Sequence, residues 1–164
     1  MTTHDHEHAA GQPGWLAADG RGLTLLAVSA TAHCLTGCAI GEVLGMVIGT
    51  ALAWSSGATV VLSVLLAFFF GYSLTITPVL KAGVSLRQAV GVALAADTVS
   101  IAVMEVTDNG IMLLVPGAME AGLASLLFWA SLAASLVLAF VVTVPVNRWL
   151  ISRGRGHAVV HGYH

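Results

Sequence analysis

Residues 32–50 read AHCLTGCAIGEVLGMVIGT, and this stretch decides the fold. Residues four apart on an α-helix share a face and lie ~6 Å apart along its axis. Two such rows run side by side here. The glycine row consists of Gly37, Gly41, Gly45 and Gly49, with His33 at its head, and the second row consists of Cys34, Cys38, Glu42 and Met46. The pattern predicts a helix that carries metal-ligand side chains into the middle of a membrane bundle.

The glycine row predicts a close contact between two helices. Glycine has no side chain, so a second helix can approach its backbone, and small residues at four-residue intervals are typical of such contacts in membranes. Two partners fit the spacing: another helix of this chain, or the same helix of a second subunit. Because four spans are few for a transporter, we expect a homo-oligomer.

The composition of the whole chain indicates an integral membrane protein. Hydrophobic residues make up 57% of the 164 residues and charged residues only 9%, which differs from ordinary soluble domains. The length fits one domain. The net charge of −2 does not indicate a nucleic-acid partner, so the expected partner is the lipid bilayer. We expect an all-α integral membrane four-helix bundle.

Four apolar segments are long enough to cross a bilayer, which needs ~20 residues per helix. They cover about residues 23–53, 58–80, 88–107 and 118–146 of a bundle at 23–147. Residues 111–116 are apolar but short, and we interpret them as a re-entrant or interfacial piece between the third and fourth spans, or as an extension of the third helix. We expect residues 1–22 to form a mobile histidine-rich tail without a cleavable signal, and residues 148–164 a basic tail that contains histidines.

All lysine and arginine residues fall on one side of this four-span topology. They are Arg21, Lys81, Arg87, Arg148, Arg153 and Arg155, and the loops on the opposite side contain none. Basic residues concentrate on the cytoplasmic side of membrane proteins. We therefore expect both termini in the cytoplasm.

Five side chains are candidates for a metal site at mid-membrane depth. They are His33, Cys34, Cys38, Glu42 and Asp97. Counted from the cytoplasmic ends of their spans, Cys34 and Asp97 reach similar depths. Soft sulfur ligands select Cu(I), so we expect copper first, and the histidine and carboxylates leave zinc or iron open. The alternative interpretation is packing, since a lone histidine or cysteine in a span often only fills space.

The carboxylates within the spans need partners of their own. A charged side chain at the bilayer centre costs at least ~2.5 kcal/mol, and no lysine or arginine lies at the depth of Glu42 or Asp97. Each is therefore protonated, hydrogen-bonded to hydroxyl groups, or bound to a cation, and a neutral acid that joins two helices is the packing alternative. For Glu105, Asp108 and Glu120, nearer the outer interface, the alternative is exposure to water.

Further residues extend the candidate set. Secondary ligands by depth and spacing are Met46, Met104, Glu105, Asp108, Met119 and Glu120. The tails add His4, His6, His8, His157, His161 and His164 as metal-collecting side chains. If Met1 is removed, a free amine followed by a histidine in third place suits Cu(II) or Ni(II). The alternative for this segment is a solvated tail.

Three stretches resemble an uncharacterised family of small bacterial membrane proteins, a domain of unknown function. They are residues 33–42 (HCLTGCAIGE), 147–150 (NRWL) and 154–161 (GRGHAVVH). The resemblance covers roughly residues 23–164 and implies a small multi-span domain of a bacterial inner membrane, with an HCxxxCxxxE motif in its first span. It also implies a place beside copper-handling proteins, but it supplies no substrate and no catalytic residues.

Four functions stay open at this point. A metal-ion transporter or channel is the leading hypothesis, and a proton pathway through Glu42, Asp97 and His33 differs from it only in the ion. A membrane thiol oxidoreductase using Cys34 and Cys38 needs a second cysteine pair for relay, and the chain has only two cysteines. An assembly subunit without chemistry accounts for the glycines but not for the buried carboxylates. The sequence thus favours transport over catalysis.

Overall fold

The computed structural model describes residues 20–81, 83–118 and 120–153, and this part of the chain is entirely helical apart from its connections. The helices are α1 (Gly20–Ala51), α2 (Ser56–Lys81), α3 (Leu86–Leu114) and α4 (Leu126–Ser152). Each of the four is long and apolar enough to cross a membrane. The predicted all-α, four-span class is therefore confirmed.

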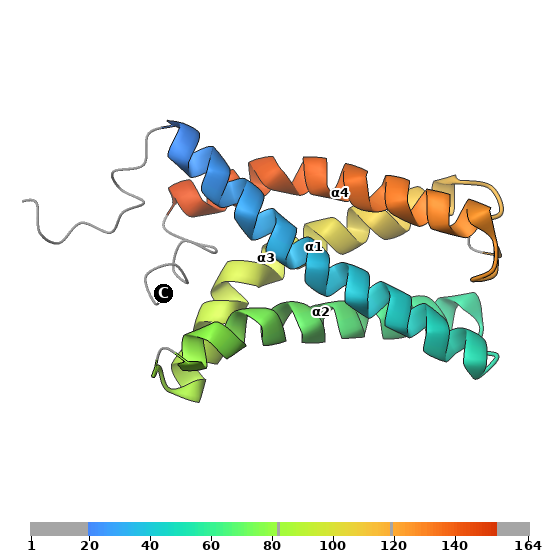
Figure 1. Cartoon of the computed structure of the whole chain (residues 1–164), viewed down its shortest axis with the longest axis horizontal. Helices are drawn as coiled ribbons and strands as arrows, with labels where there is room; N and C mark the ends of the chain where they lie inside the picture. Colours follow the sequence, from blue (N-terminus) through green and yellow to red (C-terminus); the bar gives the residue numbers. More distant parts are fainter. Residues whose placement is uncertain (1–19, 82, 119, 154–164) are drawn as a thin grey trace, which may run out of the picture.

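The two ends of the bundle differ in charge. Figure 1 shows the start of α1, the end of α4 and the α2–α3 connection together at one end, which we call the basic end. The described basic residues belong to these segments: Arg21, Lys81, Arg87, Arg148 and Arg153. The α1–α2 and α3–α4 connections lie at the opposite end, which we call the distal end.

Helix α1 crosses the bundle obliquely. It has 32 residues, which makes it about 48 Å long, against a hydrocarbon core of about 30 Å. Near the basic end it packs on α4, where Ala27 and Ala30 join one buried cluster with Ile151. Toward the distal end it moves onto α2 (Figure 1). An oblique path of this kind shortens the distance that the helix spans along the bundle axis.

The glycine row is the contact between α1 and α2. A Cβ atom placed on Gly37 would lie 2.7 Å from the Cα of Gly71, and one on Gly41 would collide with the backbone of Ala67. Gly45 and Gly49 meet α2 side chains in the same way. The facing residues of α2 are also small and four apart: Thr59, Ser63, Ala67 and Gly71. The partner of the glycine row is therefore a helix of the same chain.

Helix α3 continues beyond the predicted end at residue 107 and stops at Leu114. The Asp108-Asn109-Gly110 sequence stays helical because Asp108 is buried in the bundle and the Asn109 amide donates to the Glu105 carbonyl at 3.0 Å. Of the two interpretations of residues 111–116, the structure has the helical extension rather than a re-entrant piece, with a turn beginning at Val115.

Helix α4 begins at Leu126, later than the predicted residue 118. A turn precedes it, in which Gly117 has a φ of 79°, a conformation that favours glycine. The Ser125 side chain then accepts a hydrogen bond from the Leu127 N–H and caps the helix. The helix continues through Pro145 to Ser152, because the exposed proline is tolerated within a membrane span.

The outward surface of the bundle is apolar on every helix. Large exposed hydrophobic side chains include Leu44, Leu65, Phe69, Val106, Leu138 and Val141. A water-soluble bundle would carry polar residues at such positions, whereas lipid chains cover them without cost. The surface therefore fits a bilayer environment.

We expect Gly41→Ala to destabilise the protein by about 1–3 kcal/mol, because the new methyl group would collide with the α2 backbone. Gly91→Ala is the matched control, since nothing lies within 4 Å of a Cβ at that position. It should be neutral or raise stability by up to about 1 kcal/mol as a helix-interior glycine is removed. Thermal unfolding in detergent measures both, and equal effects would contradict the contact.

We expect the basic end to face the cytoplasm. In a cysteine-free background, Ser56→Cys and Gly122→Cys at the distal end should react with a membrane-impermeant maleimide on intact cells. Gly83→Cys at the basic end should react only after the membrane is opened. All three positions are exposed in the bundle, so the label reports membrane sidedness. Labelling of Gly83→Cys in intact cells would show that the basic end faces the outside of the cell instead.

Candidate functional site

Buried polar groups follow the axis of the bundle between α1, α3 and α4. At the basic end, the Asn147 amide donates to the Thr31 hydroxyl at 2.8 Å. Further along, α1 contributes Cys34, Cys38 and Glu42 from the row next to the glycines. One face of α3 contributes Asp97, Ser100, Met104, Glu105 and Asp108. Residues 97, 104, 105 and 108 follow helical spacing and are all buried, so they share one face of α3.

Cys34 lies between a carboxylate and a hydroxyl group of α3. Its thiol Sγ is 3.9 Å from Oδ1 of Asp97 and accepts a hydrogen bond from Ser100 at 3.4 Å. The side chains of Cys34 and Asp97 are 2% and 0% exposed. The contact confirms that these two residues share a depth, and it gives the thiol an acceptor for its proton.

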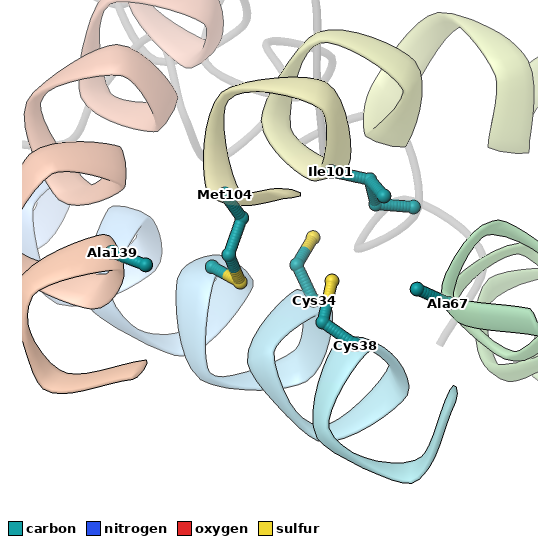
Figure 2. Packing of buried hydrophobic residues seen from close by; sticks show 6 residues of the cluster. All are labelled: Cys34, Cys38, Ala67, Ile101, Met104 and Ala139. Atoms are coloured by element: carbon teal, nitrogen blue, oxygen red, sulfur yellow. The ribbon is translucent and has the colours of Figure 1, made fainter. Parts of the chain in front are cut away.

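The second cysteine and a methionine complete a sulfur cluster, which we define as Cys34, Cys38 and Met104. All three are buried in one group of core residues, and both cysteines are free thiols. Figure 2 shows the cysteine sulfurs projecting from α1 toward α3, with the Met104 side chain reaching from α3 beside them. The carboxyl group of Glu105 interacts with Cys38. Each cysteine thus has an α3 carboxyl group as a neighbour.

His33 belongs to a different contact. Its ring Nε2 lies 3.3 Å from the Thr75 hydroxyl of α2, and the side chain is only half buried. Consecutive helix positions differ by ~100° in direction, so His33 and Cys34 face different neighbours. In the described part of the chain, no group of three or more His, Cys, Asp and Glu side chains is arranged to hold a metal ion. The five predicted ligands are therefore not gathered into one shell.

Nearer the distal end, Glu42 of α1 and Asp108 of α3 form what we call the distal acid pair. They are 5% and 3% exposed. The Ser135 hydroxyl of α4 donates to Asp108, and the Glu42 carboxyl interacts electrostatically with Asp108 and with Glu105. Glu105 is 4% exposed and bonds Asn109 through Oε2 at 3.4 Å. The alternative that placed Glu105 and Asp108 in water at the interface is thus wrong.

The remaining candidates lie outside these clusters. Met46 is partly buried and lines cavities near the distal end, and Glu120 is exposed at their mouth. Met119 and the candidate histidines of the tails lie outside the described residues: His4, His6, His8, His157, His161 and His164.

The sequence reasoning missed the hydroxyl and amide partners of the buried acids. Ser100 follows Asp97 by one helical turn, and that spacing signals a shared face. Ser135 and Asn147 are different, because their α4 segment is apolar nearly all round and has no clear polar face. Only the packing of α4 against α1 and α3 identifies them.

These observations define a four-span membrane protein with a polar, sulfur-containing core. The chain belongs to the family described as Domain of unknown function (DUF4396), whose model matches residues 26–156. No curated protein and no solved structure matches the chain. The family is thus established, and only the residues themselves indicate the function.

We expect Ser135→Ala to lower stability by about 1 kcal/mol, because Asp108 would lose its hydroxyl donor inside the bundle. Ser152→Ala is the matched control on the same helix, since Ser152 is exposed and bonds the carbonyl of Trp149 one turn earlier. It should change stability by less than about 0.5 kcal/mol. Unfolding in detergent at fixed pH compares the two, and equal losses would show that the Asp108 contact is energetically unimportant.

Proposed function

We propose that the protein binds a soft metal ion, Cu(I) in the first place, at the sulfur cluster and moves it across the membrane. The observation that carries the proposal is the burial of two free thiols and a thioether in one contact group. Thiolate and thioether sulfurs are the ligands that select Cu(I) over hard cations. Zinc and iron are secondary candidates, because they favour additional nitrogen or oxygen ligands.

The carboxyl groups beside the thiols support this assignment. A cysteine must lose its proton to bind a metal. Asp97 is the acceptor next to Cys34, and Glu105 is the neighbour of Cys38. These acceptors would pass the displaced thiol protons on toward solution, without a lysine or arginine in the membrane. No lysine or arginine lies within the four predicted apolar segments, at residues 23–53, 58–80, 88–107 and 118–146.

Transport rather than storage is proposed because the polar groups extend along the bundle. The Asn147–Thr31 pair lies nearer the basic end than the sulfur cluster, and the distal acid pair lies beyond it. With cytoplasmic termini, as the basic residues favour, this series joins the two membrane faces. Assembly into oligomers is part of the same proposal, since one four-helix bundle offers little room for a pathway.

We expect the purified protein to take up one Cu(I) per chain under reducing conditions. Cys34→Ser and Cys38→Ser should each abolish binding, and Met104→Leu should weaken it. Met112→Leu is the matched control, because Met112 is buried two turns further along α3 in another cluster. Asp97→Asn should cost about 10–100-fold in affinity as a partner of a ligand. Elemental analysis and competition with a Cu(I) chelator measure these effects.

Binding should also tighten as pH rises, because each thiol proton that is displaced contributes about tenfold per pH unit. A chain that stays metal-free after loading with Cu(I), Zn(II) and Fe(II), while both thiols react with an alkylating reagent after unfolding, would contradict the proposal. Equal losses in Met104→Leu and Met112→Leu would remove Met104 from the ligand set.

A further inference from the structure

Three adjoining cavities lead from the distal end of the bundle to Glu42. The widest, about 470 Å³, lies at the α3–α4 connection and is lined by Pro116 and Glu120. The next, about 130 Å³, also has Glu120 in its wall. The innermost, about 40 Å³, is lined by Glu42 and Asp108. Val60 lines all three, so the cavities lie next to one another.

The innermost cavity is able to hold water. A cavity needs ~10–15 Å³ for one water molecule, which then needs two to four polar partners, and this cavity is larger. Its wall is mostly apolar, and the polar residues among those that line it are the distal acid pair, Ser63 and Asn109. Asn109 also lines the widest cavity. Polar contacts therefore continue from the mouth to the acid pair.

Glu42 is the residue of this cavity whose side chain lacks a hydrogen-bond partner. Both of its carboxyl oxygens are buried without a hydrogen-bond partner among the described residues. An unpaired charge in such a place is strongly unfavourable. No lysine or arginine is among the lining residues of the three cavities. Asp108 lines the same cavity as a second acid, so it offers Glu42 no opposite charge, and an acid in the membrane interior needs a proton or a cation.

We propose that Glu42 and Asp108 share a proton that exchanges with the aqueous phase at the distal end through these cavities. A hydronium ion that reaches the pair gives its proton to a carboxylate and leaves as water. The site is too small for a cation with its hydration shell, since each water occupies ~30 Å³. Exposed Glu120 at the mouth is placed to attract cations from solution.

The titratable groups around the pair belong to two helices. Cys38 lies one turn before Glu42 on α1, and Glu105 lies on the same face of α3 as Asp108. Helices α2 and α4 contribute the hydroxyl groups of Ser63 and Ser135 rather than charges. None of the sulfur cluster lines the cavities. The acid pair and the sulfur cluster thus consist of different residues, and only the acid pair lines one of these cavities.

A hydrophobic carbodiimide tests the proposal, because it modifies protonated carboxyl groups in apolar surroundings and leaves carboxylates unmodified. The full chain in liposomes, without metal, should be labelled at Glu42 or Asp108, as mapped by mass spectrometry. Labelling should fall about tenfold per pH unit once the carboxyl loses its proton. Glu42→Gln should remove the label at residue 42. Gly91→Ala is the control, a helix-interior change with open space around the new methyl group and away from the cavities, and it should retain the label at residue 42.

Access through the cavities is tested separately in a cysteine-free background. Asn109→Cys should react with a small hydrophilic thiol reagent added at the distal side, whereas Thr143→Cys, buried in α4 away from the cavities, should not. If Glu42→Gln does not fold, the pH dependence of carbodiimide labelling in the unaltered chain decides whether the proposal holds.

Three results would overturn the proposal. They are absence of label at both acids between about pH 5 and pH 10, equal reactivity of Asn109→Cys and Thr143→Cys, and loss of label on adding Na⁺, Mg²⁺ or Cu(I) at constant pH. The last result would assign the acid pair to that cation. Because the labelling needs no copper, its failure would leave the proposed metal function untouched, and failure of copper binding would leave the proton site standing.

Discussion

The close contact between α1 and α2 determines where the reactive side chains of the protein point. The backbone and small side chains of α2 pack directly against the glycine row, so this face of α1 has no room for other contacts. Its neighbouring row is turned by ~100°, which brings Cys34, Cys38 and Glu42 into the interior of the bundle, where they meet residues of α3. A bulkier residue in the glycine row would separate the helices and rotate or displace the ligand row as well.

The second constraint is the separation of positive and negative charge. All basic side chains of the described helices lie at the basic end, whereas the buried acids lie in the interior and toward the distal end. Lipid supplies no counter-ion, so each acid must find a proton, a hydroxyl group or a cation. Ser100 and Ser135 provide hydroxyl groups at two depths. The cysteine sulfurs beside Asp97 and Glu105 suit a soft metal ion. The distal cavity, which Glu42 and Asp108 line, suits a proton.

The sequence predicts much of this arrangement, but only the position of each residue along its helix. The four spans, the glycine row and the shared depth of Cys34 and Asp97 follow from composition and helical spacing, and the structure has all of them. What spacing does not determine is the direction of a side chain relative to its neighbours. His33 is adjacent to Cys34 in sequence and yet contacts Thr75 of α2.

The errors at the helix ends have a similar origin. The Asp108-Asn109-Gly110 sequence is typical of a turn, but burial of Asp108 and the Asn109 hydrogen bond keep it helical. Residues 118–125 are apolar enough to extend a span, whereas the capping side chain of Ser125 sets the actual start of α4. Tertiary contacts and helix caps determine where these helices end, and hydropathy alone predicts neither kind of interaction.

Glu105 connects the two proposed sites. It interacts with Cys38 on one side and with Glu42 on the other, and it bonds Asn109 in the wall of the distal cavity. Under the two proposals, a Cu(I) ion that replaces two thiol protons leaves the sulfur cluster with one extra negative charge. In a medium of low dielectric constant, this charge favours protonation of the nearby distal acid pair. By linkage, a proton on the acid pair then favours the metal to the same extent. The two ions would thus bind cooperatively.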